Sequence, residues 1–313
     1  MSLTSLIRNP IIRKEILSHC AIPKIDKMEM LIQRRTNNPS VLGTAVDYAI
    51  RFWLEKKHSG IQVNPLVAEL ALTRDIPEFT FNKKSEARKI VKQALEYIEQ
   101  AKVLDDSFCY WVFQLANLDL IYRQQIMPKS IPMIPSQNDI RELKDLVALA
   151  IKSWPVPRSY CLLNPTFGTA SQMVGGADAD VIQDSTIIDI KCVAEPSISD
   201  VVVQLIGYTS LYSAGTIDKL PIGENIDKIG VYYARHGKYL SWDIGEICSW
   251  QEIKGLYLFL ETMVKQGTLT TGNRGLGTDN GTMEYLEKAF SQDENIDVGR
   301  IFEDENNGFD FLV

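Results

Sequence analysis

Two aspartates and a lysine, Asp180, Asp189 and Lys191, are residue types that together could catalyse phosphodiester chemistry. A pair of carboxylates can hold a hard divalent cation such as Mg²⁺, which keeps several waters and binds substrate phosphate. Such a cation polarises a phosphoryl oxygen and lowers the pKa of a bound water, which becomes a nucleophile near neutral pH. A lysine on the same face can orient that water or stabilise the charge that develops at phosphorus. These residue types therefore predict a metal-dependent phosphodiesterase site.

The three side chains meet only if residues 175–191 (GGADADVIQDSTIIDIK) form a β-hairpin. The turn residues Asp184-Ser185 separate two runs of strand-forming residues, which is typical of such a hairpin. A turn at this position places Asp180 directly opposite Asp189. Opposed residues have Cβ atoms only about 5 Å apart, so two carboxylates there repel each other unless a proton or a cation lies between them.

A second aspartate, Asp178, is an alternative to Asp180 as the first carboxylate. The same register places Asp178 opposite Lys191, and strand alternation puts it on the same face as Asp180 and Asp189. The residues alone leave both aspartates as candidates.

The pattern of an acid, any residue and a lysine is not specific by itself. It also occurs at three positions with helical periodicity, where solvated helix faces are the simplest interpretation: Glu55/Lys57, Glu142/Lys144 and Glu252/Lys254. A surface hairpin with a polar face is the alternative for Asp189 and Lys191. Both lie inside the apolar run Ile187–Val193, however, which favours a central strand.

Apolar periodicity predicts helices before Pro155 and a mixture of strands and helices after it. The expected helices are 40–57, 85–104, 108–127, 136–154, 200–212 and 250–264. Residues 160–163 form a short apolar segment, and the expected strands are 173–181, 186–193, 229–234 and 239–244, with a second hairpin turn at His236-Gly237. This order predicts an α/β (α+β) fold, in which helices flank a small central mixed sheet.

The order of motifs resembles the PD-(D/E)XK nuclease superfamily, most closely its RecB-like and phage-type exonuclease branch. The motifs are a helix with Gly43-x-x-x-Asp47, the glycine-rich aspartate hairpin, Asp189-Ile190-Lys191, and Gln204-Leu205-x-x-Tyr208. The resemblance spans roughly residues 40–245, although no motif falls in the helical stretch between Gly60 and Pro155. It implies a restriction-endonuclease-like core with a large helical insert at about 61–154 and a sheet core at about 155–245.

The resemblance also implies ligands for Mg²⁺ or Mn²⁺. In this branch the motif acids hold the cation, which points to Asp47, Asp180, Asp189 and the backbone carbonyl of Ile190. We favour Asp180 over Asp178 because it opens the apolar strand, as the acid of this family usually does. Related proteins commonly carry His where this chain has Asp47, and an aspartate can also bind a hard cation.

The catalytic residues that the resemblance implies are Lys191, which supports the attacking water, together with Asp180 and Asp189. Gln204 and Tyr208 lie four residues apart and therefore share one helix face. The family pattern directs that face at the lysine and the nucleic acid strand. The simpler interpretation is an exposed polar residue at Gln204 and a core aromatic residue at Tyr208.

Composition and charge exclude several classes of protein. The 313 residues carry a formal net charge of −7 and a mean hydropathy of −0.08, which argues against a generally basic nucleic-acid coat. No stretch is apolar enough to cross a membrane, the first residues lack a signal-peptide core, and five scattered cysteines form no paired motif. We therefore expect a cytoplasmic protein.

Charge is unevenly distributed along the chain. Residues 1–57 carry a local charge of +5, whereas residues 267–313 carry −7. We expect a nuclease-like domain over residues 1–266 and an acidic C-terminal tail over 267–313. The tail could dock a protein partner, although a solvated tail that aids solubility is the simpler interpretation.

Three functions are consistent with the sequence. The first is a metal-dependent nuclease that hydrolyses phosphodiester bonds in DNA, with RNA as an alternative substrate. The second is a catalytically inactive nucleic-acid-binding or scaffold module of the same fold, although an intact Asp/Asp/Lys set argues against it. The third is an interaction protein whose acidic tail docks a partner and whose hairpin is incidental.

Overall fold

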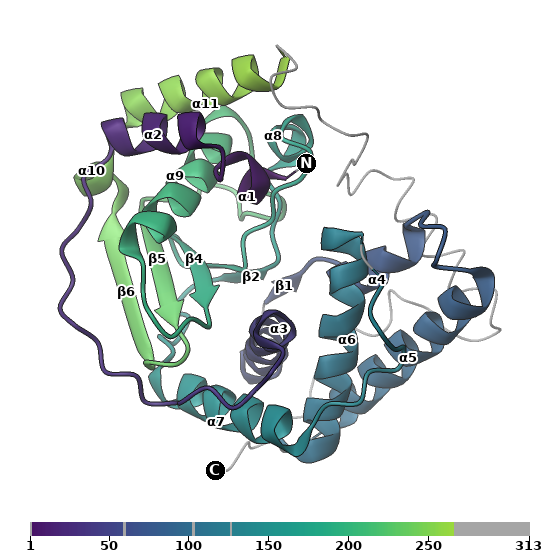
Figure 1. The fold of residues 1–313 in the computed structure, drawn as a ribbon. Coiled ribbons are helices and arrows are strands. Elements are labelled where there is room, and N and C mark those ends of the chain that lie inside the picture. The colour runs from purple at the N-terminus through teal and green to yellow at the C-terminus, as the bar shows by residue number, and fades with distance from the viewer. Residues whose placement is uncertain (1, 59–60, 102–103, 126, 266–313) are drawn as a thin grey trace. The chain divides into compact units, whose positions relative to one another are not determined.

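The computed structural model describes residues 2–58, 61–101, 104–125 and 127–265 (Figure 1). The described chain divides into two compact units. Of the described residues, the first unit contains 2–34, 53–58, 61–64 and 146–265, and the second contains 35–52, 65–101, 104–125 and 127–145. The predicted acidic tail, 267–313, lies outside the described residues.

The first unit is built on a six-stranded mixed sheet. Its strands follow the order of the chain: β1 (Gln62–Val63), β2 (Cys161–Leu163), β3 (Val181–Gln183), β4 (Thr186–Lys191), β5 (Lys228–Tyr233) and β6 (Lys238–Asp243). Strand β1 is parallel to β2 and β4 is parallel to β5, while the other neighbours are antiparallel. The structure therefore confirms an α/β fold with a mixed sheet.

Strand β4 lies in the middle of this sheet, between β3 and β5. Its first four residues are buried, which explains why the sequence there is an almost unbroken apolar run. Parallel strands need a crossover connection, and helix α9 (Ile198–Ala214) provides it between β4 and β5. The predicted apolar spacing of this helix is confirmed, because Val201, Leu205 and Tyr208 are all buried.

A second helical layer covers α9 on the side away from the sheet (Figure 1). It contains α2 (Pro10–His19) and α11 (Trp250–Lys265), with the short helices α1 (Leu3–Leu6), α8 (Gly168–Met173) and α10 (Ile244–Ile247) nearby. Helix α2 begins where Asn9 accepts a hydrogen bond from the Ile11 amide, and Pro10 occupies the first helical position. Its buried residues Ile12 and Ile16 then pack into the core.

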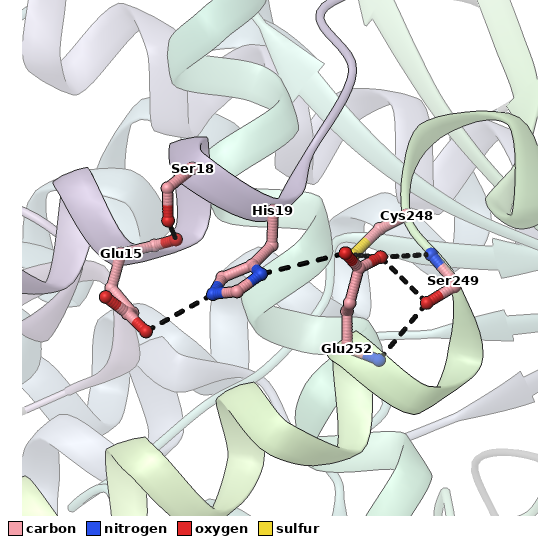
Figure 2. A network of polar contacts seen from close by, with 6 residues as sticks. All are labelled: Glu15, Ser18, His19, Cys248, Ser249 and Glu252. Atoms are coloured by element: carbon pink, nitrogen blue, oxygen red, sulfur yellow. Dashed lines mark hydrogen bonds and ion pairs between the residues drawn. The ribbon is translucent and has the colours of Figure 1, made fainter.

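A polar network joins the end of α2 to the start of α11 (Figure 2). His19 lies between two carboxylates, with its Nε2 3.3 Å from Glu15 and its Nδ1 3.7 Å from Glu252. Glu252 also accepts hydrogen bonds from the amide and the hydroxyl of Ser249 at 3.0 and 2.7 Å, which caps α11. This network links α2 to the start of α11, and α2 also packs against α9.

The other face of the sheet packs against the C-terminal end of α7 (Gln137–Ser153). The Trp154 ring lies 5.0 Å from the ring of Tyr232, and Ser153 Oγ lies 2.8 Å from Tyr232 Oη. Trp154 Nε1 donates to Gln183 Oε1 at 2.9 Å. The sheet is thus covered by helix-derived side chains on both faces.

The second unit is helical within its described residues. Its elements are α4 (Val67–Leu70), the short 3-10 helix η1 (Ala71–Thr73), α5 (Phe81–Gln100), α6 (Asp106–Gln124) and parts of α3 (Pro39–Lys57) and α7. The four long helices predicted before Pro155 are confirmed, with ends shifted by a few residues. No helix in the described part of the chain has the length and apolar character needed to span a membrane.

The predicted strand 173–181 is wrong over most of its length. Helix α8 ends at Met173, and strand β3 begins only at Val181. Gly175 and Gly176 between them have φ angles of 76° and 124°, which an extended strand does not contain. The glycines end the helix and turn the chain towards the hairpin.

Replacing Glu69 in α4 with Gln should stabilise the protein at pH 8. The Glu69 carboxylate is buried and accepts a hydrogen bond from the Leu66 amide at 2.7 Å. Burial raises the pKa of Glu69 from 4.5 to about 7. The folded state therefore binds this proton more tightly, and the resulting stabilisation is complete below about pH 4.5 and lost as the pH rises towards about 7.

Gln stays neutral and keeps an acceptor for the Leu66 amide. The free energy of unfolding should rise by about 3 kcal/mol at pH 8, which is detected as a higher thermal midpoint. This increase should vanish near pH 4. Glu78→Gln changes an exposed glutamate of the same unit and is the matched control. Equal midpoint shifts at pH 4 and pH 8 would contradict the prediction.

Candidate active site

The predicted hairpin register is confirmed. Strands β3 and β4 pair antiparallel through Val181–Ile188, Ile182–Ile187 and Gln183–Thr186. Asp184 occupies the turn with a φ of 48°, and its carboxylate accepts hydrogen bonds from the amides of Arg158 and Ser159. The turn is thus held by side-chain contacts as well as by the ladder.

The two strands separate just beyond the Val181–Ile188 pair, at Asp180. In a continued ladder the Ile190 amide would donate to a backbone carbonyl of the β3 strand. It donates instead to the Asp180 carboxylate, Oδ2, at 2.7 Å. The Asp180 side chain therefore takes the place of the main-chain acceptor and lies beside Asp189.

The prediction that Asp178 lies opposite Lys191 is wrong. The backbone before Val181 pairs with residues 164–166 instead, through an antiparallel bridge between Thr166 and Asp178 and a 3.0 Å hydrogen bond from the Ala179 amide to the Pro165 carbonyl. Pairing with the β2 side thus continues through Asp178, whereas pairing with β4 ends at Val181, and periodicity within the hairpin gives no sign of this difference. Asp178 nevertheless stays close enough to raise the pKa of Tyr208.

Asp189, Lys191 and Gln204 form one connected cluster between β4 and α9. Asp189 Oδ2 lies 2.6 Å from Lys191 Nζ, and Asp189 Oδ1 accepts a hydrogen bond from Gln204 Nε2 at 2.8 Å. Lys191 Nζ also donates to Gln204 Oε1 at 2.9 Å. A single amide thus holds both the acid and the lysine, which fixes their orientation relative to each other.

Tyr208 supports this arrangement from one turn further along α9. Its hydroxyl accepts a hydrogen bond from Gln204 Nε2 at 3.2 Å, and its ring stacks on Phe167 with centroids 5.4 Å apart. Burial, reinforced by the carboxylates of Asp178, Asp180 and Asp189, holds the pKa of Tyr208 well above its ordinary value. Tyr208 is therefore a neutral, buried side chain whose hydroxyl faces the carboxylates.

The charges in the cluster are strongly coupled. Burial raises the pKa of Asp189 to about 6, the negative charge of Asp180 acts in the same direction, and Lys191 opposes both. Burial also lowers the pKa of Lys191, but the attraction of Asp189 and Asp180 outweighs it and leaves that pKa above its ordinary value. The lysine is thus a cation that contacts Asp189 and is also stabilised by the charge of Asp180.

The cluster offers oxygen ligands that suit a hard cation. Asp180 and Asp189 supply two carboxylates. Within the described part of the chain, the buried Asp189 Oδ2 forms the ion pair with Lys191 and accepts no other hydrogen bond. The Lys191 carbonyl accepts from the Ala234 amide on the β5 side, so strand alternation directs the Ile190 carbonyl towards Asp180.

Among the described residues, no group of three or more His, Cys, Asp or Glu side chains is arranged to hold a metal ion. Mg²⁺ usually takes one or two carboxylates and keeps water in its other positions. Two carboxylates and a carbonyl therefore fit Mg²⁺ or Mn²⁺ better than Zn²⁺, which takes three or four side-chain ligands.

Asp47 belongs to the second unit, where it lies on α3. Its carboxylate forms an ion pair with Arg51, one helical turn later, and the Arg51 side chain is buried. The ion pair is the contact expected of residues four apart on a helix. A role for Asp47 as a metal ligand stays a prediction.

Two further side chains lie near the cluster and were not predicted from the sequence. Arg13 on α2 contacts Asp200 at the start of α9, with its Nη2 2.6 Å from Oδ1. Tyr233 on β5 is the register partner of Lys191. Both depend on contacts between distant parts of the chain, and residue type or local spacing carries no signal for them.

Comparison of the chain with protein-family models, with curated proteins and with solved structures gave no significant match. The candidate site is therefore defined by the geometry of Asp180, Asp189, Lys191 and Gln204.

Proposed function

We propose that this protein is a divalent-metal-dependent nuclease that hydrolyses phosphodiester bonds in DNA. One observation carries the proposal: Asp180, Asp189 and Lys191 lie close together where strands β3 and β4 separate. Gln204 links Asp189 to Lys191 by hydrogen bonds to both. We also propose a restriction-endonuclease-like fold. The mixed sheet supports it, because its central strand β4 carries both Asp189 and Lys191.

Each residue has a definite task in this proposal. Asp180 and Asp189 would hold Mg²⁺ or Mn²⁺ together with the Ile190 carbonyl. The cation would supply Lewis-acid activation of the phosphate and of a bound water. Lys191, a partly buried cation, would orient the attacking water and stabilise the charge that develops on the phosphoryl oxygens.

Gln204 and Tyr208 would act as positioning residues. Gln204 holds the Asp189 carboxylate and the Lys191 ammonium at once, so it limits the freedom of both groups. The Tyr208 hydroxyl accepts a hydrogen bond from the Gln204 amide, and the side chain is too deeply buried to reach a substrate. Such preorganisation keeps charged groups in place before the reaction begins.

A nuclease assay on the complete chain tests this function directly. Linear, circular and single-stranded DNA, and a matching RNA, should be offered with Mg²⁺, with Mn²⁺ and with chelator. We expect cleavage of DNA that requires the cation and stops with chelator. Binding of DNA without cleavage under any of these conditions would favour the non-catalytic nucleic-acid-binding module.

Replacing Arg13 with Ala should weaken substrate binding more than it slows chemistry. The Arg13–Asp200 pair is partly exposed, and such pairs contribute little stability, so the guanidinium can exchange Asp200 for a phosphate. We expect KM for DNA to rise about 3- to 10-fold and kcat to change less than about twofold. The salt dependence of binding should lose about one unit of slope.

Lys14→Ala is the matched control, because Lys14 is the next residue of α2, carries the same charge and is exposed. Its KM should stay within about twofold of the unmutated protein. Equal effects of the two substitutions would show that only the overall charge of α2 matters, and would contradict a phosphate contact at Arg13.

A further inference from the structure

Tyr233 lies directly beside Lys191 in the sheet. The parallel register pairs Asp189 with Val231 and Lys191 with Tyr233, so the Tyr233 side chain projects from the same face as the two charged residues. Its side chain is completely buried. The neighbouring Tyr232 projects from the opposite face, where its hydroxyl contacts Ser153.

The Tyr233 hydroxyl is buried without a hydrogen-bond partner among the described residues. Buried hydroxyl groups normally have a partner, because leaving one unpaired forfeits its hydrogen bonds to water. The ring is packed edge-on against His236, with centroids 6.0 Å apart. Burial raises the pKa of Tyr233 to about 12 and the carboxylates of Asp189 and Asp200 add to this effect, so the hydroxyl is neutral.

The Lys191 ammonium group can donate one more hydrogen bond than the structure gives it. Its ammonium group has three N–H donors, and the structure gives it the Asp189 carboxylate at 2.6 Å and the Gln204 carbonyl oxygen at 2.9 Å. A cation held by Asp189 would compete with the lysine for the same carboxylate. The ammonium group would then need a replacement for that contact.

We propose that Tyr233 is a positioning residue for Lys191, whose ammonium donates to the Tyr233 hydroxyl when Asp189 turns towards a bound cation. Tyr233 thereby keeps the lysine beside the reacting phosphodiester instead of letting it follow the carboxylate. The proposal rests on the proposed function, because it assigns the cation to Asp189 and the catalytic role to Lys191.

Tyr233→Phe removes only the hydroxyl, and Tyr232→Phe is the matched control on the next residue. For Tyr233→Phe we expect kcat on DNA to fall about 10-fold, KM to change less than about twofold, and the thermal midpoint to hold or rise, since an unpaired hydroxyl is lost. Tyr232→Phe should show the reverse, with cleavage within about twofold and a lower thermal midpoint, because it loses the Ser153 contact.

A calorimetric titration with Mn²⁺ in the absence of nucleic acid gives a second readout. Tyr233→Phe should weaken Mn²⁺ binding about 3- to 10-fold, because the displaced ammonium finds no new acceptor, and Tyr232→Phe should not. Unchanged kcat and Mn²⁺ affinity in Tyr233→Phe, or a loss of activity that parallels a lower midpoint, would overturn the positioning role. If the unmutated protein cleaves nothing, the proposed function fails, and the Mn²⁺ titration alone decides the role of Tyr233.

Discussion

An Asp189→Asn variant should lose at least about 10³-fold of its cleavage rate and bind Mn²⁺ at least about 10-fold more weakly. Asn keeps the shape of the side chain and its contact with Gln204, but it removes the negative charge that offsets the cation. Calorimetric titration measures the affinity, and single-turnover cleavage of labelled DNA measures the rate. Thermal unfolding in chelator should show an equal or higher midpoint, because a buried carboxylate beside Asp180 is removed.

Asp184→Asn is the matched control for this substitution. Asp184 lies in the turn of the same hairpin, and Asn tolerates its positive φ angle. Mn²⁺ affinity and cleavage should stay close to those of the unmutated protein. If Asp189→Asn also kept its Mn²⁺ affinity, Asp189 would not be a ligand, and the nuclease proposal would lose its central residue.

A Lys191→Ala variant separates catalysis from binding. It removes the ammonium group and leaves both carboxylates in place, so cleavage should fall by about 10²-fold or more, the scale of losing one preorganised donor. Binding of DNA, measured in Ca²⁺ to suppress turnover, should change far less, because one cation among several phosphate contacts is a modest share of the affinity.

Lys228→Ala is the control for the loss of a lysine from the same sheet. Lys228 pairs with Thr186 at the opposite end of β4 and contacts Asp243 at the surface. It should leave both cleavage and binding unchanged. Equal losses of binding and cleavage in Lys191→Ala would instead make Lys191 an ordinary phosphate contact.

The hairpin was predictable because its determinants are local. The turn residues Asp184-Ser185 set the register, and the apolar run around Ile187 and Ile188 identified a central strand. Those two facts were sufficient to bring Asp180 close to Asp189. The convergence of Gln204 on this site came from the family resemblance, and the structure places its amide against both charged groups of β4.

Features that depend on distant parts of the chain were not predictable in this way. Asp178 lies beyond the point where β3 stops pairing with β4, although its backbone still pairs with Thr166 on the β2 side, and hairpin alternation contains no trace of that difference. Tyr233 reaches the site through the parallel register of β4 and β5, which the length of the α9 crossover does not reveal. The contact of Arg13 with Ser199 joins residues 186 positions apart.

The packing of α2 against α9 and α11 also constrains the order in which the chain can fold. Helix α2 is synthesised well before its partners, because the residues of α9 and α11 that it packs against follow Ile12 and Ile16 by some 180 or more residues. Contacts of such long range form slowly, and apolar surface that waits for its partner is exposed to aggregation. The helices of residues 65–145 contact near neighbours in sequence and can form during synthesis. The apolar face of α2 therefore waits during synthesis for α9 and then α11, which makes chaperone capture of this helix a requirement to consider in producing the protein.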